Sequence, residues 1–312
     1  MDASKVAIIY KILILNGENS NFIFSDNILF NKDKTRMIYI LSSAIENGQK
    51  VFEIPNTVTT LENGTIEQFS SLNKIIIPAS VNNIADFRFF NGRITEVEID
   101  AGNNTYMSDG NAIYSKNKQI LYMYYKNLSS IQVDENVTII NGYAFFLCTN
   151  LRNLVIGKNV TSLTLDWRWD NRKGNITSLN IDEDNKKYTV EGNAIYTKNE
   201  EGNLNTLVSV WGNITELEIP NGVKIIGYGA LRVTNITRLI LPDTIESIGD
   251  EVFVNSKLTE IRIPKSLKSI GNNVFEGCSN LTKIEIDNKK GSIPGSPWGC
   301  PIGERAIIWL QE

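Results

Sequence analysis

Two pairs of glutamates are the best candidates for acid–base chemistry in this sequence. Glu96 and Glu98 lie two residues apart, and so do Glu216 and Glu218. On a β-strand, such a pair projects from one face with about 6.5–7 Å between its members, which is within the separation that inverting glycosidases use for their carboxylates. Nothing in the flanking sequence sets one carboxyl apart as acid and the other as base. The pairs therefore favour an acidic surface over a catalytic site.

Trp167 and Trp169 are the candidates for stacking against a ligand. They lie in the segment LDWRWDNRKGN, which also contains Arg168 and Arg172. Paired tryptophans beside arginines can stack on sugars or anchor a protein partner. Elsewhere in the chain the equivalent place holds an Ala-Phe or Val-Phe pair, so we expect at least one of the two rings to pack in the core.

The composition removes several kinds of chemistry. The 312-residue chain contains no histidine, the commonest general base and metal ligand in proteins. Its three cysteines have no neighbours at metal-ligand spacing, so we expect buried free thiols, no metal site and no cofactor. The formal net charge of −4 provides no basic surface, which excludes nucleic acid as a partner.

The most apolar early run, Val6 to Leu15, does not predict a membrane span. It is shorter than the ~20 residues that a spanning helix needs, and Lys11 interrupts it. It also lacks the basic start and small-residue cleavage site of a secretion signal. We expect an edge strand here and no membrane insertion, and the sequence leaves open whether a signal was removed or the protein stays in the cell.

The elements that carry these residues are set by a repeat. Residues 258–280 read LTEIRIPKSLKSIGNNVFEGCSN, and similar stretches recur along the chain. Five further copies occupy 72–93, 128–150, 151–175, 214–235 and 236–257. A period of about 22 residues is the signature of a solenoid. Such a unit is too small to bury its own apolar side chains, so each turn must pack on its neighbours.

Each repeat predicts a main strand, a short return strand and a bend. In the copy at 258–280, alternation places Ile261 and Ile263 inward and Glu260 and Arg262 outward. A second apolar pair predicts the return strand; its copies are Val81/Ile84, Val137/Ile140, Val223/Ile226, Ile245/Ile248 and Leu267/Ile270. The residues that follow predict a left-handed bend, namely Gly227, Gly249, Gly271 and Asn141. A Val-Phe or Ala-Phe pair after the bend predicts a single helical turn.

A longer period of 82 to 84 residues is superimposed on the short one. Asn27, Asn111 and Asn193 occupy equivalent places in three β-rich insertions, each of which predicts a hairpin. We expect one solenoid domain over residues 1–312. Its parts are an N-terminal cap strand and first hairpin at 1–47, repeats at 48–287 with hairpins near 106–125 and 188–211, and a C-terminal cap at 288–312.

These motifs resemble the BspA-like bacterial surface leucine-rich-repeat family. The resemblance rests on the L-x-x-I-x-I-P strand, the S-[LV]-x-x-I-G-x-x-[AV]-F return and the PWG ending, and it covers about residues 22 to 312. It implies a mainly β solenoid, a right-handed coil of the leucine-rich-repeat type with a parallel sheet, short return strands and terminal caps. It also implies a non-catalytic adhesion module in a secreted or cell-surface protein.

The outward side chains of the main strands form the surface expected to bind a protein or glycan. From Ser130 to Asn180 these positions are neutral and rich in hydrogen-bonding groups, which suits an extended peptide or a glycan. A more C-terminal row alternates in charge through Glu216, Arg238, Glu260 and Lys283, which predicts exposed ion pairs. The ligand-binding candidates are Glu96, Glu98, Ser130, Gln132, Asn153, Ser178, Asn180, Glu216, Glu218, Arg238, Trp167 and Trp169.

Two alternatives to a surface-binding module remain at this stage. One is an intracellular protein–protein scaffold of the same fold, and the other is a carbohydrate-active enzyme that uses the paired glutamates.

Five Asn-x-Thr/Ser sequons share one repeat position, so we expect them to form a structural ladder; they begin at Asn127, Asn175, Asn213, Asn235 and Asn280.

Overall fold

The computed structural model describes residues 21–40, 50–62, 72–85, 87, 94–164 and 175–311. The chain divides into two compact units, residues 1–127 and 128–312, and each is described by itself. The single-domain organisation and its cap boundaries remain predictions. The strand expected at Val6–Leu15 and the pair Trp167 and Trp169 lie outside the described residues.

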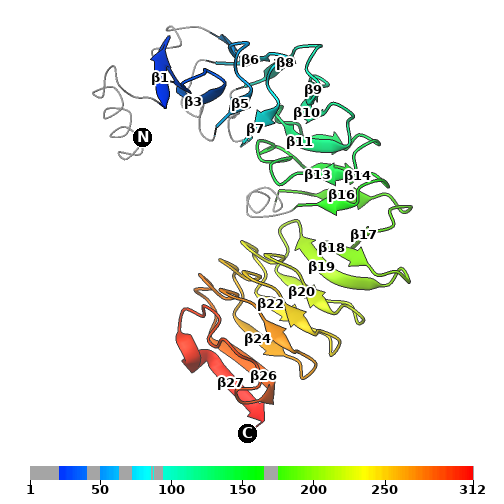
Figure 1. Ribbon diagram of the computed structural model, residues 1–312. Coiled ribbons are helices and arrows are strands. Elements are labelled where there is room, and N and C mark those ends of the chain that lie inside the picture. Colours follow the sequence, from blue (N-terminus) through cyan, green and yellow to red (C-terminus); the bar gives the residue numbers. More distant parts are fainter. Residues whose placement is uncertain are drawn as a thin grey trace. The chain divides into compact units, whose positions relative to one another are not determined.

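The first unit combines antiparallel insertions with parallel strands (Figure 1). Two three-stranded antiparallel insertions consist of β1 (Phe22–Ser25), β2 (Ile28–Asn31) and β3 (Arg36–Ile40), and of β9 (Tyr106–Ser108), β10 (Ala112–Ser115) and β11 (Ile120–Tyr124). The parallel sheet contains β4 (Val51–Glu53), β6 (Lys74–Ile77) and β8 (Glu96–Ile99). Two short return strands run parallel to β3, namely β5 (Thr60–Leu61) and β7 (Asn83–Ile84).

The second unit repeats this plan over more turns. Its first parallel sheet contains β12 (Ser130–Gln132), β14 (Asn153–Ile156) and β16 (Ser178–Ile181), with return strands β13 (Ile139–Ile140) and β15 (Ser162–Leu163). An antiparallel insertion follows, formed by β17 (Tyr188–Glu191), β18 (Ala194–Lys198) and β19 (Leu204–Val210). Return strands β21 (Ile225–Ile226), β23 (Ser247–Ile248) and β25 (Ser269–Ile270) run parallel to β19.

The last parallel sheet is the longest and is called the C-terminal sheet below. It contains β20 (Glu216–Glu218), β22 (Arg238–Ile240), β24 (Glu260–Ile263), β26 (Lys283–Lys289) and β27 (Ile307–Gln311), and a short 3₁₀ turn, η3 (Gly303–Ala306), precedes β27. The register pairs Ile261 with Ile284 and Ile263 with Ile286, and these four side chains are at most 3% exposed. The predicted solenoid is therefore confirmed, and its inward rows are continuous.

The predicted role of the bend glycines was wrong. Gly227, Gly249 and Gly271 do not have positive φ; the left-handed residues lie two positions later, at Gly229, Glu251 and Asn273. A Cβ on Gly271 would lie 2.5 Å from the backbone nitrogen of Asp250 and 2.6 Å from the carbonyl carbon of Gly249. Glycine is needed here because adjacent turns approach too closely to admit a side chain. Asn141, outside the left-handed region, accepts a 3.0 Å hydrogen bond from the Tyr143 N–H.

The expected helical turn after each bend is instead a run of tight turns, and these turns stack from one repeat to the next. Backbone N–H groups donate to the next turn, from Leu231 to Val252 O at 3.0 Å and from Phe253 to Val274 O at 2.9 Å. The left-handed residue begins one of these turns, because the carbonyls of Gly229 and Glu251 accept from the N–H groups of Arg232 and Val254. The rings of Phe253 and Phe275 stack with centroids 5.3 Å apart, so this side of the coil is also a continuous core row.

The insertions form part of the side of the solenoid and contribute side chains to its core; they do not protrude as hairpins. Tyr114 and Tyr196, in their middle strands, are each 1% exposed. Tyr124 and Tyr125, at the end of the same insertion, are buried, and half-buried Tyr122 stacks on Phe87 with ring centroids 4.8 Å apart. A register shift beside Tyr114 interrupts the simple alternation of inward and outward side chains here.

Two buried asparagines join the insertions to the preceding turn. Asn103 and Asn185 are 82 residues apart and fully buried. The Asn103 amide donates to Pro78 O and Val81 O, and its Oδ1 accepts from the N–H groups of Thr105 and Tyr106, all within 2.8–2.9 Å. Asn185 repeats the same four bonds with its own neighbours. Sequence analysis missed these residues, although they follow the same long period.

Replacement of Gly271 by alanine should destabilise the protein by roughly 1–3 kcal/mol, because the new Cβ would overlap the neighbouring turn. The matched control is Gly157→Ala, where φ is not positive and a Cβ would meet no atom within 4 Å. Thermal or denaturant unfolding of the two variants measures the difference. Equal stability losses would contradict the close-approach explanation.

Burial raises the pKa of Tyr106, Tyr114 and Tyr196 above the ordinary value of 10.0. Because the folded-state pKa is the higher one, the stability gained from the neutral phenols is complete below pH 10 and is lost as the pH rises beyond it. We expect the phenolate absorbance of these rings to appear together with loss of circular dichroism, and Tyr114→Phe to raise the midpoint of alkaline unfolding. Gradual ionisation in a protein that stays folded would contradict this.

Candidate functional site

Three of the predicted ligand-binding residues lie together on the outward face of the C-terminal sheet. Glu216 on β20 is in register with Arg238 on β22, and their side chains form an exposed ion pair at 3.7 Å. Glu216, Glu218 and Arg238 line a hollow of about 150 Å³ together with Ile240. The sequence-predicted row of alternating charges is confirmed, because Lys283 also pairs with Glu260, at 3.3 Å.

Ile240 also lines a second and larger hollow, of about 1000 Å³, on the same sheet. We call the two hollows together the furrow. Its larger part is lined by Ile240, Asp243, Arg262, Lys265, Asp287 and Leu310, among others. The furrow therefore crosses the ends of β22, β24, β26 and β27, where the register of β26 and β27 shifts after Ile286.

An ion pair holds the middle of the furrow in place. The Arg262 guanidinium donates from Nε to both carboxylate oxygens of Asp287 at 3.1 Å, and its Nη2 lies 3.0 Å from Asp287 Oδ1. The carboxylate raises the pKa of Arg262, so the arginine is always charged. Ile240 and Leu310 flank this pair and are 39% and 48% exposed. An oriented arginine between two exposed aliphatic side chains is a typical arrangement for binding a partner.

Sequence reasoning missed most of this furrow. Arg262 was placed on the outward face, but neither Arg262 nor Ile240 was among the binding candidates. Asp287 directly precedes the C-terminal cap expected at 288–312, and Leu310 lies within it. The available signal was the replacement of outward charges by aliphatic side chains at Ile240 and Leu310.

The first glutamate pair does not have the arrangement of a catalytic pair. Glu96 and Glu98 project from β8 and both contact the ammonium of Lys74 on neighbouring β6, at 2.7 and 2.8 Å. Their hydrogen bonds raise the pKa of Lys74. A lysine thus occupies the place between the carboxylates that a hydrolytic water would need.

The predicted neutral residues form rows on a separate sheet of the second unit. Ser130, Asn153 and Ser178 are in register on β12, β14 and β16, as are Gln132 and Asn180 with Val155 between them. Ser178 is half-buried and the other named polar side chains are exposed. The Asn180 amide donates to Ser178 Oγ at 3.4 Å. These residues provide polar groups, but they lie on a different sheet from Glu216, Glu218 and Arg238.

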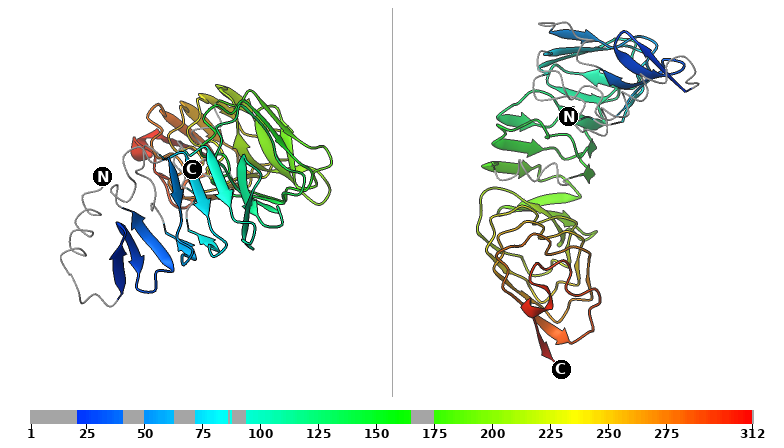
Figure 2. Two further views of the ribbon diagram at one scale, coloured as in Figure 1. Left: turned by 90° about the horizontal axis from the view of Figure 1, so that it is seen from above. Right: turned by 90° about the vertical axis from the view of Figure 1, so that its left-hand side faces the viewer.

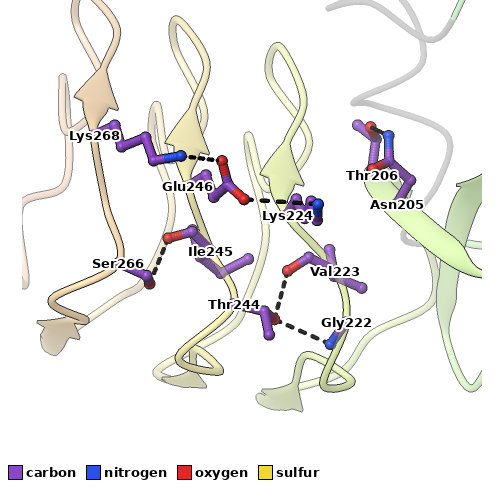
Figure 3. A network of polar contacts seen from close by, with 10 residues as sticks. All are labelled: Asn205, Thr206, Gly222, Val223, Lys224, Thr244, Ile245, Glu246, Ser266 and Lys268. Atoms are coloured by element: carbon purple, nitrogen blue, oxygen red, sulfur yellow. Dashed lines mark hydrogen bonds and ion pairs between the residues drawn. The ribbon is translucent and has the colours of Figure 1, made fainter.

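Ladders of polar side chains explain other conspicuous residues. The Asn235 amide donates to Asn213 Oδ1 at 2.5 Å, and the Thr237 hydroxyl donates to Thr215 O at 3.2 Å, which confirms the structural ladder for these two sequons. Directly before the return strands, the carboxylate of Glu246 bridges Lys268 and Lys224 at 2.6 and 3.7 Å (Figure 3). Lys268 lowers the pKa of Glu246 through this hydrogen bond.

The described residues show little that could serve metal or thiol chemistry. Cys148, Cys278 and Cys300 are buried free thiols, as predicted, and burial raises the pKa of Cys278. Within the described ranges, no three acidic or cysteine side chains gather as metal ligands. In the same ranges, no helix has the length and apolar character needed to cross a membrane.

Comparison with known proteins supports the architecture. The family described as BspA type Leucine rich repeat region matches in six copies, over residues 44–164, 118–200 and 209–297. A leucine-rich repeat protein from Eubacterium ventriosum is similar in structure, with a TM-score of 0.55 and 18% identity over 93% of this chain and 78% of its own. A leucine rich cell surface protein from Faecalibacterium prausnitzii gives 0.51 and 17%, over 95% and 94%. No curated protein matches the sequence.

Proposed function

Because the chain belongs to the BspA type leucine-rich repeat family, we propose that it is a non-catalytic binding module of a bacterial cell-surface or secreted protein. The similar Faecalibacterium protein is described as a cell surface protein, which supports the proposed location. Lys74 between Glu96 and Glu98 argues against the carbohydrate-active alternative for the first glutamate pair, and the ion pair of Glu216 with Arg238 argues against it for the second. Adhesion through a bound protein ligand is the role that this architecture serves best.

The furrow is the observation that carries this proposal. Its side chains project from strands whose backbones are fixed by the neighbouring turns, so little order has to be created when a ligand binds. The Arg262–Asp287 pair fixes polar groups in the middle, and Ile240 and Leu310 offer apolar contacts on either side. The predicted candidates Glu216, Glu218 and Arg238 belong to the same furrow at its β20 end.

The chemistry of the furrow favours an extended peptide over a glycan. Its described lining is mainly aliphatic and charged, and the apolar members of the larger hollow are Leu239, Ile240, Leu241, Pro264 and Leu310. Sugar-binding sites commonly use flat aromatic rings against the sugar face, and the described lining contains none. A peptide can place an apolar side chain beside Ile240 or Leu310 and hydrogen-bond its main chain to the charged pair.

Trp167 and Trp169 remain ligand-binding candidates, as do the polar residues from Ser130 to Asn180. The contribution of these residues to ligand binding is a proposal separate from the furrow, because the tryptophans lie outside the described residues. A Trp167→Ala variant in the same binding experiment tests it.

The test is a screen of residues 1–312 against peptide and glycan arrays, followed by affinity measurements on the strongest peptide. Ile240→Lys should weaken peptide binding at least about tenfold, the scale of a central contact residue. The matched control is Ile139→Lys, since Ile139 is 37% exposed on return strand β13 and is not part of the furrow lining. Equal losses in both variants, or selective binding of glycans only, would overturn the proposal.

A further inference from the structure

The last strand of the C-terminal sheet carries a different outward surface from the strands before it. Charged side chains point outward from the preceding strands, namely Arg238, Glu260, Arg262, Lys283 and Glu285. On β27 the corresponding positions hold Ile308 and Leu310, which are 44% and 48% exposed. Apart from Ile240 on β22, the exposed outward aliphatic side chains of this sheet are thus on its last strand.

This strand is also an unprotected edge. Strand β27 pairs with β26 on one side, and among residues 175–311 no strand pairs with its other side. Figure 1 and the right-hand view of Figure 2 both place it, in red, at the end of the stack. Soluble proteins usually protect such edges with charges or proline, and the sequence IIWLQ of β27 has neither. An apolar edge with unpaired backbone groups favours association with another strand.

The core beneath β27 is incomplete. Ile284 and Ile286 on β26 are 0% exposed, whereas their neighbours Ile307 and Trp309 on β27 are half-buried. A hollow of about 350 Å³ remains here, lined by Ile293, Pro294, Ile307 and Trp309 and by two charged residues. Within residues 175–311, no further turn packs on the inward side chains of β27 as each earlier turn packs on its neighbour.

The two charged residues lie at opposite ends of β27. The Lys290 N–H donates to Gln311 O at 3.2 Å, which places Lys290 at the end of the strand. Glu304 lies in η3, directly before the strand begins. Neither forms an ion pair within the described part of the chain. A strand that runs antiparallel to β27 and carries the same two charges would place a lysine and a glutamate of different copies at each end of the paired strands.

We propose that β27 pairs with β27 of a second copy of this chain, in an antiparallel arrangement about a two-fold axis through Trp309. In this register Ile308 lies opposite the partner's Leu310 on the outward face, and Trp309 lies opposite the partner's Trp309. Lys290 comes near the partner's Glu304. The same patch thus serves both copies, as a closed two-fold dimer requires. The two C-terminal sheets join into one, with both furrows on the same side.

Sedimentation velocity of residues 1–312 over a range of concentrations tests the dimer. We expect a reversible monomer–dimer equilibrium that Leu310→Lys weakens at least tenfold, because two ammonium groups replace an apolar contact. The matched control is Ile240→Lys, which introduces the same charge on the same face at β22 and should leave the dimer intact. A monomer at all concentrations, or a dimer unaffected by Leu310→Lys, would overturn the proposal.

Charge reversal tests the antiparallel register. Lys290→Glu and Glu304→Lys should each weaken the dimer, and the double variant should restore it. In the wild-type protein, the amides of residues 307–311 should become more protected from hydrogen exchange as concentration rises. A dimer without this protection, or without rescue by the double variant, would rule out the β27 interface. Ile240→Lys should weaken peptide binding without weakening the dimer. The proposal of peptide binding and the proposal of a dimer can therefore fail independently of each other.

Discussion

Neighbouring turns must complete one another's core, and the rest of this structure depends on that constraint. A single repeat buries only a few apolar side chains, which is too little to offset the backbone entropy lost when about 22 residues become ordered. In the second unit, the inward residues of successive turns form one cluster that includes Ile219, Ile226, Ile263 and Ile286. Stability is therefore shared along the stack.

The same constraint explains the residues that interrupt the simple repeat. Gly271 is required because the next turn lies against its Cα, and Asn103 and Asn185 satisfy backbone groups where an insertion joins the stack. It also explains why the proposed binding surfaces lie on the outward face and on the last strand of the C-terminal sheet. Inward positions are fixed by the core, so only the remaining side chains are free to vary with a ligand or partner.

Much of the fold could be predicted from the sequence, because period and alternation encode strand register directly. The row Glu216, Arg238, Glu260 and Lys283 follows from a spacing of 22 or 23 residues. The conformation of the bends could not be predicted, because glycines that recur at a regular spacing are explained equally well by a positive φ and by close contact between turns. The third strand of each insertion was missed because the sequence pattern does not show that it joins the row of return strands.

The candidate site was only partly predictable for a similar reason. Glu216, Glu218 and Arg238 were identified because they follow the repeat, whereas Asp287 and Leu310 lie where the repeat becomes irregular. Their proximity depends on how residues 287–311 fold back to add β27, which no local pattern specifies.

Native-state hydrogen exchange on an Ile263→Ala variant tests the central claim most directly. Ile263 is fully buried on β24, between β22 and β26. If turns stabilise their neighbours, the amides of β22 and β26 should lose protection together with those of β24, and those of β20 should lose less. Loss of protection confined to β24 would contradict the account.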